Sequence, residues 1–450
     1  MLISELKDKS ILIWGFGVEG SSAFNVMKNI TDKIVVAVKD KSKCESMCDG
    51  VKFINEDEIL NSEYDYVIKS SGVSKYRKDI ETLEKRGTKI TTIQNIFLSE
   101  VSDKKNKNNL PKIIGITGTK GKSTTASMIN HILNNLGFKS ILVGNIGVSV
   151  FDVLSKMKEY DYVVIEFSSY QCAMLEEKLD YSVVLNLFPE HIDWHLTHEN
   201  YFRDKLNITK FSDSAVISYN NDTVKRYLDK NLNNVTYFNN KDGFHINGDF
   251  ICFCDEKIYN INDIATINGI HIFENLCSIL TILKNEGLDV QKAMETLKTF
   301  KTLEHRLEVF YKSNNMICVD DSISTIPEAT IRAINTFKND IYLVLGGYDR
   351  QQDFNELINT INAKGNIKKL FLTGETGKRM LKLFSDTNLK IEYDYYDSLR
   401  EIVSSIDFNK LNDTTLLLSP ASASYDKYKN FEERGNLFKS LINDKIKRIS

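Results

Sequence analysis

A glycine-rich loop between an expected strand and an expected helix constrains this chain more than any other segment. The loop runs Gly115-Ile-Thr-Gly-Thr-Lys-Gly-Lys-Ser123, after the apolar run Lys112 to Ile116 and before a helical pattern. Glycines let backbone N–H groups converge on phosphate oxygens, Lys122 adds a positive charge, and the hydroxyl of Ser123 or Thr124 can ligate Mg²⁺. The spacing G-x-x-x-x-G-K-S would need a glycine directly after Gly115, so the match is to the shorter form G-T-x-G-K-S. The segment predicts an α/β nucleotide-binding domain, with ATP as the expected ligand.

Composition excludes several classes of protein. The chain has 450 residues, too many for one ordinary core, so roughly two to four domains are expected. A net charge of −3, from 58 basic and 61 acidic residues, gives no field that would attract nucleic acid or an anionic membrane. No apolar run approaches the roughly 20 residues of a membrane span, and the polar start does not resemble a signal peptide. Seven scattered cysteines fit reduced thiols. A cytoplasmic protein without nucleic-acid or membrane partners is expected.

A second glycine loop lies near the start of the chain. The apolar strand Ile11–Trp14 runs into Gly15-Phe-Gly-Val-Glu-Gly20, a G-x-G-x-x-G pattern. A second strand, Ile34–Val38, follows, and Asp40 lies 20 residues beyond the last glycine, as in dinucleotide-binding folds. Any nucleotide diphosphate could use such a loop, so nicotinamide binding is one alternative among several.

Strands alternate with helices along the chain, which predicts mostly parallel sheets with ligands at the carboxyl ends of the strands. The polar stretch 101–109 is expected to be a linker or exposed loop. With boundaries near residues 100 and 303, the sequence predicts three α/β domains, residues 1–100, 101–302 and 303–450. The expected strands are Ile11–Trp14, Ile34–Val38, Tyr64–Ile68, Ile113–Thr117, Ser140–Val143, Tyr162–Phe167, Ser182–Leu187, Ala215–Ser218, Met316–Val319, Ile341–Gly347, Lys369–Gly374 and Thr414–Pro420, and two helices are expected at Ile272–Glu286 and Val290–Phe300.

Two strand ends in the middle domain carry polar groups. Glu166 ends the buried-type strand in Tyr162-Val-Val-Ile-Glu-Phe-Ser-Ser-Tyr-Gln171. In a phosphate-loop sheet an acid there faces the phosphates and can hold Mg²⁺, the alternative being a surface ion pair with a lysine. The second strand end is followed by His191 and His195, with His198 nearby, which raises zinc as an alternative, but no acid or cysteine set completes a site. Ordinary hydrogen bonding is expected for His195 and His198.

Motifs spread over the whole chain resemble those of the Mur ligases. In order they are Gly118-Thr-Lys-Gly-Lys-Ser-Thr124, Gly144-Asn-Ile-Gly147, Glu166-Phe-Ser-Ser-Tyr-Gln171, His191-Ile-Asp193, Gly269-x-His271-x-x-x-Asn275, His305-Arg306-x-Glu308, Asp321-Ser322, Leu418-Ser-Pro-Ala-Ser-Ala-Ser424 and Asn430-Phe-Glu-Glu-Arg-Gly435. The last motif is the most specific and is similar to that of the glutamate-adding branch. The resemblance implies an N-terminal Rossmann-like UDP-binding domain, a central ATPase and a C-terminal Rossmann-like domain.

The resemblance also implies a reaction. The terminal carboxylate of UDP-N-acetylmuramoyl-L-alanine would attack the γ-phosphate of ATP, and the amine of glutamate would displace phosphate from the resulting acyl phosphate. Two anions must approach each other, so cations are needed. The family's catalytic positions correspond to Lys122, Glu166, His191 and Lys205. One Mg²⁺ would lie at Ser123 and Glu166, and a second at His191 beside a carbamylated Lys205; the alternative for Lys205 is a solvated helix lysine.

Binding residues follow from the resemblance, motif by motif. For ATP they are Gly118, Thr119, Lys120, Gly121, Lys122, Ser123, Thr124, Asn275, Arg306 and Asp321, the last as the residue that reads the ribose. For the UDP substrate they are Gly15, Phe16, Gly17, Val18, Asp40, Ser71, Gly72, Asn145, Ser168, Gln171 and His191. For glutamate they are Thr325, Arg350, Ser424 and Phe431, with Arg350 as a bidentate donor to a carboxylate.

Two residues depart from the family pattern. Ile323, in Asp321-Ser-Ile-Ser-Thr-Ile326, stands where many members have lysine, which removes a cation near the amino-acid site. Glu19 replaces a small or hydroxyl residue beside the expected diphosphate, and its charge would repel phosphate unless the side chain turns away. D-glutamate is the expected amino acid, with L-glutamate left open.

Three alternatives to this reading stay open. One is another Mur-type ligase, such as one resembling folylpolyglutamate synthase. Another is a nucleotide-binding sensor that keeps the fold without catalysis, although a sensor needs no second metal site. The third is a dehydrogenase that uses the first glycine loop, although no proton-relay residues accompany that loop. A monomer is expected.

Overall fold

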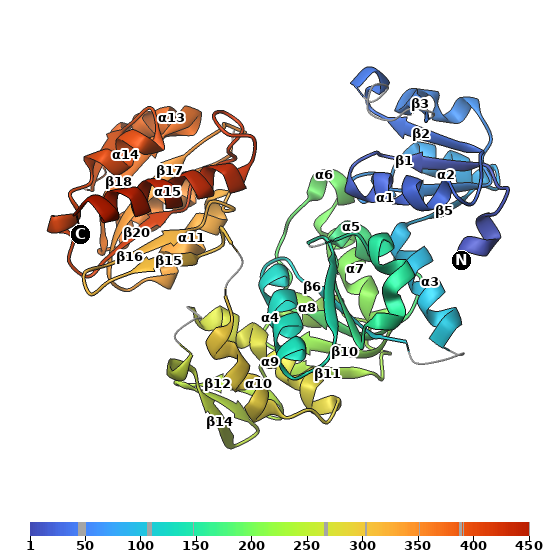
Figure 1. Ribbon diagram of the computed structural model, residues 1–450, viewed down its shortest axis with the longest axis horizontal. Coiled ribbons are helices and arrows are strands. Elements are labelled where there is room, and N and C mark those ends of the chain that lie inside the picture. The colour runs from blue at the N-terminus through green and yellow to red at the C-terminus, as the bar shows by residue number, and fades with distance from the viewer. Residues whose placement is uncertain are drawn as a thin grey trace. The chain divides into compact units, whose positions relative to one another are not determined.

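The chain folds into two compact units, residues 1–300 and residues 301–450. The structure is a computed structural model that describes residues 1–43, 51–105, 110–146, 148–264, 269–301, 304–350, 352–386, 389 and 391–449 (Figure 1). Gly147 of the expected Gly144-Asn-Ile-Gly147 motif lies outside the described residues. Both units are α/β, as the sequence predicts. The further division of residues 1–302 into two domains stays a prediction.

The first unit begins with a five-stranded sheet in the order β3-β2-β1-β4-β5, in which every pair is parallel. Its strands are β1 Ile11–Trp14, β2 Ile34–Val38, β3 Lys52–Asn55, β4 Tyr66–Lys69 and β5 Lys89–Thr91, and its helices are η1 Ile3–Leu6, α1 Val18–Met27, η2 Lys41–Lys43, η3 Glu56–Asn61, α2 Lys78–Lys85 and α3 Ile93–Lys105. Successive residues of β1 enter cores on opposite faces: Ile11 and Ile13 on one, Leu12 and Trp14 on the other. Burial on both faces explains why these short strands read as continuous apolar runs.

A six-stranded parallel sheet follows in the same unit, in the order β11-β10-β9-β6-β8-β7. Its strands are β6 Lys112–Thr117, β7 Ser140–Gly144, β8 Tyr162–Glu166, β9 Leu179–Val184, β10 Ser212–Ser218 and β11 Val235–Phe238. The associated helices are α4 Lys122–Asn135, η4 Val150–Glu159, α5 Ser169–Cys172, α6 Ile192–His195, α7 His198–Leu206, η5 Asn207–Phe211, α8 Asp222–Tyr227, α9 Ile270–Asn285, α10 Val290–Thr296 and η7 Leu297–Thr299. Strand β6 is central, so the loop after it lies between the ends of β8 and β9.

Two sequence expectations in this unit are wrong. Strand β9 ends at Val184, whereas the expected strand ran from Ser182 to Leu187. The chain leaves the sheet there to pair with the phosphate loop, because Leu185 N donates to Thr117 O and Thr119 N donates to Asn186 O. The expected linker at 101–109 is helical as far as Lys105, since Val101 packs into the core; residues 106–109 lie outside the described part of the chain.

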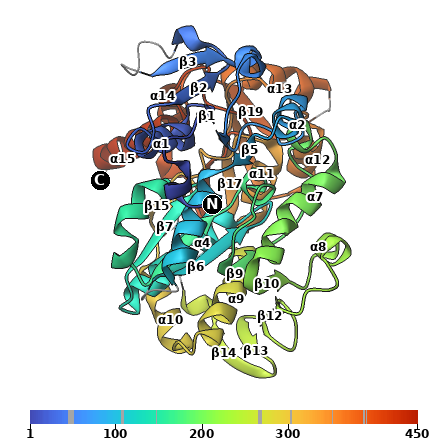
Figure 2. The same ribbon diagram turned by 90° about the vertical axis from the view of Figure 1, so that its right-hand side faces the viewer.

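A small antiparallel sheet completes the first unit. It consists of β12 Phe244–Asn247, β13 Phe250–Phe253 and β14 Glu256–Asn260, followed by η6 Ile261–Asp263. Figure 2 shows it beside α9.

The second unit holds a six-stranded sheet in the order β15-β16-β20-β17-β18-β19. Its strands are β15 Glu308–Lys312, β16 Met316–Asp320, β17 Asp340–Gly346, β18 Ile367–Thr373, β19 Glu392–Tyr395 and β20 Thr414–Leu418, and its helices are α11 Pro327–Thr336, α12 Asn355–Ala363, α13 Gly374–Asp386, α14 Leu399–Ser405, η8 Phe408–Lys410 and α15 Phe431–Ile449. Strand β15 pairs antiparallel with β16, and the other pairs are parallel. Among the described residues of either unit, no helix is both long enough and apolar enough to cross a membrane.

Candidate active site

The phosphate loop lies between β6 and the first turn of α4. Gly121 is the N-cap of α4 and has φ +85°, a left-handed conformation that glycine adopts without strain. A Cβ atom there would lie 2.3 Å from Nδ2 of Asn275 on α9, so the position also lacks space for a side chain. Lys122 Nζ donates to the carbonyls of Gly118 and Thr119 at 2.9 and 3.0 Å. The structure thus brings Asn275, an expected ATP contact, against the loop.

The segment after β9 holds the loop from the other side. Lys120 N donates to Asn186 Oδ1 at 2.9 Å, and Asn186 Nδ2 donates back to Lys120 O at 3.0 Å. The Lys120 ammonium forms an ion pair with Glu190. Thr119 Oγ1 lies 2.8 Å from the hydroxyl of Tyr201 on α7. Side chains from outside the loop, those of Asn186, Glu190 and Tyr201, therefore hold the loop in its shape.

Glu166 lies beside the phosphate loop with one oxygen unpartnered. In the parallel register it pairs with Ile116 of β6, and its side chain is 1% exposed. Oε1 accepts from Asn145 Nδ2 at 3.0 Å, whereas Oε2 has no hydrogen-bond partner among the described residues. A buried carboxylate oxygen without a donor is costly. Such an oxygen suits a divalent cation with oxygen ligands, and Ser123, the other residue expected to hold Mg²⁺, is buried in the first turn of α4.

Lys205 is a buried lysine at the floor of the same loop. Its ammonium donates to Gly118 O at 3.0 Å and to Thr117 Oγ1 at 3.4 Å. Burial, and then the charge of Lys122, lowers the pKa of Lys205 to about 7. A solvated helix lysine, the alternative reading of the sequence, is therefore excluded.

His191 begins the short helix α6 in a left-handed conformation, with φ 56°. Its ring is half exposed, and Nε2 lies 3.6 Å from Glu190 Oε2. Partial burial lowers the pKa of His191; Glu190 opposes the shift, while Lys205 and Lys122 add to it. A neutral imidazole is the form that binds metal. The sequence analysis did not select Glu190, although its position directly before His191 could have indicated it.

His195 belongs to a buried hydrogen-bonded cluster. Its Nδ1 lies 2.7 Å from Asp204 Oδ2 and its Nε2 lies 3.0 Å from Ser169 Oγ. Asp204 also accepts from Lys75 Nζ at 2.5 Å and from the Tyr76 hydroxyl at 3.0 Å. The order Ser–His–Asp resembles a nucleophilic triad, but His195 is 0% exposed, so no substrate reaches it. Both ring nitrogens are used, which agrees with the expected hydrogen-bonding role and leaves none for zinc.

The first glycine loop is tightly closed, and Glu19 lies inside it. A Cβ atom on Gly20 would lie 1.9 Å from Gly15 O, so the last glycine is sterically required. Glu19 Oε2 accepts from Ser71 N at 2.7 Å and from Ser71 Oγ at 2.5 Å. Glu19 Oε1 accepts from Gln94 Nε2 and Gln171 Nε2, both at 2.7 Å. Two expected UDP-binding residues, Ser71 and Gln171, thus donate to a carboxylate of the chain itself.

The other residues expected to bind the UDP substrate lie around this loop. Val18 is 74% exposed, whereas the Phe16 ring packs edge-on against Phe24 and Phe53. Asp40 accepts from Ser42 N and Oγ. Ser168 caps α5 by accepting from Gln171 N.

Two cavities connect these residues to His191. One of about 440 Å³ is lined by Lys39, Glu56, Gly72, Val73, Ser74, Arg77, Tyr170, His191, Asp193 and Trp194. The other, of about 790 Å³, is lined by Lys39, Asp40, Asn55, Glu56, Asp57, Leu60, Arg77 and Asp79. They share Lys39, Glu56 and Arg77. The two cavities are therefore neighbours. Asp40, expected near the nucleotide of the UDP substrate, lines one, and His191, expected near the reacting carboxylate, lines the other.

The C-terminal unit brings its predicted residues to the carboxyl ends of β16, β17 and β20. Asp321 is buried, and it accepts from Ser324 Oγ at 2.6 Å, Ser419 Oγ at 2.7 Å and Leu307 N at 3.2 Å. Burial raises the pKa of Asp321 to about 6. Its carboxylate is thus turned into the unit, and ribose binding there stays a prediction. Arg306, another expected ATP contact, has a buried Nε without a hydrogen-bond partner in the described part of the chain.

A buried arginine that the sequence analysis did not select, Arg434, links the segments that carry two of the expected glutamate residues, Ser424 and Phe431. Arg434 Nε donates to Ser322 Oγ at 3.0 Å, NH2 donates to Ser322 O at 2.8 Å and NH1 donates to Ala423 O at 3.2 Å. Ser322 Oγ in turn donates to Phe431 O at 2.8 Å. Ser424 follows directly and is buried, whereas Arg350 is exposed above the Tyr425 ring. Thr325 is partly buried in the segment just before α11.

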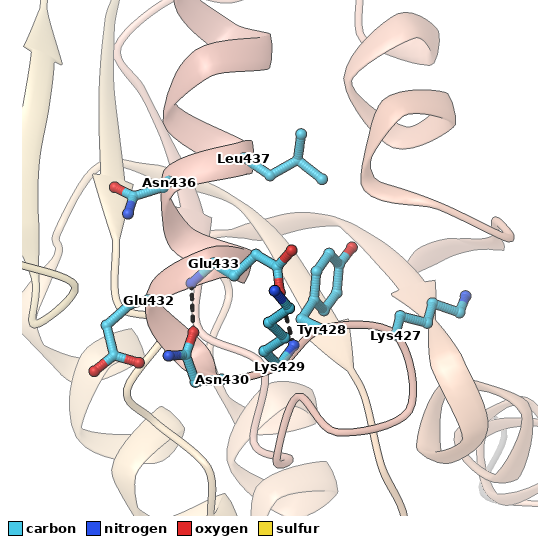
Figure 3. A pocket seen from close by; sticks show the side chains of 8 residues that line it. All are labelled: Lys427, Tyr428, Lys429, Asn430, Glu432, Glu433, Asn436 and Leu437. Atoms are coloured by element: carbon cyan, nitrogen blue, oxygen red, sulfur yellow. Dashed lines mark hydrogen bonds between the residues drawn. The ribbon is translucent and has the colours of Figure 1, made fainter.

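An open cavity of about 740 Å³ lies at the start of α15 (Figure 3). Its lining consists of Lys427, Tyr428, Lys429, Asn430, Glu432, Glu433, Asn436 and Leu437. The side chains of Asn430 and Glu433 cap the helix, through Glu433 N to Asn430 Oδ1 at 2.9 Å and Lys429 N to Glu433 Oε2 at 2.7 Å. None of the expected glutamate residues lines this cavity, and its polar groups serve the helix end.

A second cluster of metal-ligating residue types, His305, Glu308 and Asp320, lies in the same unit. His305 Nδ1 is 2.6 Å from Asp320 Oδ2, and Glu308 pairs with Lys439 at 2.9 Å. A Cβ atom on Gly435 would lie 2.2 Å from His305 Nδ1. Lys439 on α15 binds Glu308 on β15, and His305 binds Asp320 on β16, so both carboxylates already have partners and the cluster fastens α15 to the edge of the sheet.

Comparison with known proteins adds sequence and fold relationships. Residues 116–272 match the family model described as the Mur ligase middle domain, and residues 7–92 match one described as C2185-like, N-terminal. The chain is 32% identical over 458 residues to the UDP-N-acetylmuramoylalanine–D-glutamate ligase of Clostridioides difficile (strain 630), covering 98% of this chain and 99% of the relative. It is 29% identical over 454 residues to the UDP-N-acetylmuramoyl-L-alanine–L-glutamate ligase of Xanthomonas oryzae pv. oryzae (strain MAFF 311018), covering 98% and 96%. In fold it is similar to the MurF ligase of Thermotoga maritima in complex with ADP, with a TM-score of 0.55, 16% identity and coverage of 98% and 97%.

Proposed function

Because the chain belongs to the Mur ligase family, we propose that it is an ATP-dependent ligase that adds glutamate to UDP-N-acetylmuramoyl-L-alanine in peptidoglycan precursor synthesis. The observation that carries the proposal is Glu166 Oε2, which has no hydrogen-bond partner among the residues that the structure describes, next to a phosphate loop whose Gly118 carbonyl accepts from the buried Lys205. A nucleotide sensor or a dehydrogenase has no need of that combination.

The chemistry divides into two steps. A carboxylate oxygen of the substrate attacks the γ-phosphorus of ATP, the bond from that phosphorus to the bridging oxygen breaks, and ADP leaves. The amine nitrogen of glutamate then attacks the acyl carbon, its carbon–oxygen bond to phosphate breaks, and the amine loses a proton. Lys122 would lie against the transferred phosphate and offset its charge, as basic groups do in phosphoryl transfer.

Two cation sites are part of the proposal. Ser123 and Glu166 would hold one Mg²⁺, and His191 and a carbamylated Lys205 the other. Carbamylation needs a neutral amine, and a pKa of about 7 makes that form available at neutral pH. The modification would also convert a buried cation into an anion suited to Mg²⁺. Bound there, Mg²⁺ would offset the charge of the phosphates that approach the substrate carboxylate.

The substrates are assigned to different parts of the chain. The UDP substrate would lie in the two cavities from Asp40 to His191, with Asn145 and Ser168 nearer the phosphate loop. Glutamate would be held by Thr325, Arg350, Ser424 and Phe431, and ATP also by Arg306 and Asp321. The proposal includes three domains, residues 1–100, 101–302 and 303–450, and a cytoplasmic monomer; sedimentation equilibrium tests the monomer.

D-glutamate is the proposed amino acid. The relative from Clostridioides difficile is named for D-glutamate and the one from Xanthomonas oryzae for L-glutamate, at similar identity. Ile323 replaces the lysine common in the family, so a cation does not decide the choice here. Competition between the two enantiomers, with the product hydrolysed and its glutamate resolved on a chiral column, decides between them.

An isotope experiment tests the acyl phosphate. The UDP substrate is labelled with ¹⁸O in its terminal carboxylate and incubated with ATP, Mg²⁺ and glutamate. Mass spectrometry of the released phosphate should show one ¹⁸O atom for each turnover, because the carboxylate oxygen that attacks phosphorus leaves with it. Unlabelled phosphate alone would show that ATP is merely hydrolysed.

A further inference from the structure

Glu19 is held in place by four hydrogen bonds. Each carboxylate oxygen accepts two: Ser71 N and Oγ donate to Oε2, and Gln94 and Gln171 donate to Oε1, at distances from 2.5 to 2.7 Å. Gln94 and Gln171 are 3% and 4% exposed. Buried amide donors need an acceptor, and Glu19 supplies it.

The four donors come from segments that are far apart in sequence. Glu19 lies in the first turn of α1, Ser71 follows β4, Gln94 lies at the start of α3 and Gln171 lies in α5. One carboxylate therefore joins the first glycine loop to both the sheet end and the middle of the unit. Its charge is balanced locally, because Lys69 at the end of β4 is buried and interacts electrostatically with Glu19.

Gln171 carries the connection toward the phosphate loop. Its Oε1 accepts from Ser168 N at 2.8 Å, so both ends of its amide are engaged. Ser168 lies two residues after Glu166, whose Oε2 has no hydrogen-bond partner among the described residues. The glycine loop of the nucleotide end and the strand end of the reacting site are thus linked through a single side chain.

We propose that Glu19 is a positioning residue for the UDP substrate, which fixes the first glycine loop against Ser71 and Gln171 through its four hydrogen bonds. Ser71 and Gln171 then act on the substrate through Glu19 and the loop rather than as free phosphate donors. The proposal rests on the proposed function for its ligand. The carboxylate of Glu19 faces these donors inside the unit. Glu19 therefore orders the diphosphate site and does not repel the UDP substrate.

The substitution Glu19→Gln tests this with almost no change in shape. Either orientation of the new amide turns an N–H group toward existing donors: the Ser71 pair in one case, Gln94 and Gln171 in the other. Gln171 cannot flip to compensate because its oxygen already binds Ser168 N. The dissociation constant for uridine diphosphate, measured by calorimetry, should rise at least tenfold, and that for ADP with Mg²⁺ should change less than twofold.

Three further variants keep the test sharp if Glu19→Gln folds poorly. Gln94→Leu removes one donor without changing the charge, and should weaken uridine diphosphate binding about threefold, in line with one lost hydrogen bond. The double variant Glu19→Gln, Gln94→Glu returns a carboxylate to the cluster and should recover part of the lost affinity. Glu81→Gln, an exposed glutamate on α2, is the matched control and should stay within twofold.

Each outcome decides the proposal. Tighter uridine diphosphate binding by Glu19→Gln would mean that Glu19 repels the ligand, and unchanged binding would mean that it has no role. Equal losses for uridine diphosphate and ADP would show a general structural effect and also overturn it. Failure of the unsubstituted protein to bind uridine diphosphate would instead overturn the proposed substrate, and the positioning role with it.

Discussion

The first unit contains two glycine loops built on the same plan, strand, loop and helix, and their surroundings differ in charge. The loop after β1 encloses Glu19, whose carboxylate has donors on both oxygens. The loop after β6 contains Lys122 and lies against Lys205 and Glu166, and Glu166 Oε2 has no hydrogen-bond partner in the described part of the chain.

This difference in charge indicates at which loop chemistry is expected. A saturated carboxylate has little left to gain from a ligand, so the first loop is suited to hold a nucleotide in a fixed place. At the second loop, the buried Lys205, the folded-back Lys122 and Glu166 Oε2, which has no donor among the described residues, carry a desolvation cost. Phosphate and metal would offset that cost, so the second loop is the expected reacting site.

Removing the cation of the second loop should have the largest effect on activity. Lys122→Ala is expected to lower kcat about 10³-fold, because the γ-phosphate loses its charge partner. Steady-state phosphate release measures this. Uridine diphosphate binding at the first loop should not change. Lys158→Ala, an exposed lysine on η4, is the control, and a kcat for Lys122→Ala within tenfold of the unsubstituted protein would refute the role.

Glu166→Gln sharpens the role assigned to the bare oxygen. The bond from Asn145 can persist, while the metal loses a charged ligand, so kcat should fall about 10²-fold. The Mg²⁺ concentration for half-maximal activity should rise. Titration of activity with Mg²⁺ measures both, with the exposed Glu159→Gln as control. An unchanged Mg²⁺ titration would contradict the metal site.

The low pKa of Lys205 predicts a pH dependence. Above pH 7 the buried amine is mostly neutral and can add CO₂, whereas below pH 7 it is protonated and cannot. Activity should therefore fall about tenfold between pH 8 and pH 6, and added bicarbonate should oppose the fall. Protein equilibrated with ¹³C-bicarbonate should show a carbamate signal by NMR that Lys205→Arg lacks. Full activity in Lys205→Arg would rule out the modification.

The smallest expected effect compares two glycines of the first loop. A Cβ on Gly20 would meet Gly15 O at 1.9 Å, whereas a Cβ on Gly17 meets nothing within 4 Å, and Gly17 has φ −80°. Gly20→Ala should destabilise the unit by about 2 kcal/mol or more, and Gly17→Ala by less than about 1 kcal/mol. Thermal unfolding midpoints measure the difference, and equal midpoints would contradict the tight closure.

Local pattern explains what the sequence predicted well. Strands β1, β2 and β6 are continuous apolar runs because both faces are buried, and Glu166 was placed correctly at the end of β8 from that pattern alone. The end of β9 was wrong because the phosphate loop, a distant segment, takes the hydrogen bonds of Leu185 and Asn186. Strand β19 was missed because its residues are only partly buried.

Tertiary contacts explain what the sequence could not predict. In the sequence, Glu19 is a charged residue beside an expected phosphate loop. Only the positions of Gln94 and Gln171 show that hydrogen-bond donors surround its carboxylate. Arg434 was part of a quoted motif, yet its hydrogen bonds go to Ser322, Gly346 and Ala423, all more than 10 residues away in sequence. The motif signalled its importance but not its role.

The most direct test of the central claim is phosphate release by the purified protein with ATP, Mg²⁺, UDP-N-acetylmuramoyl-L-alanine and each glutamate enantiomer. We expect phosphate release that requires the nucleotide substrate and glutamate together and that is faster with D-glutamate. Phosphate release no higher than background with both enantiomers would contradict it.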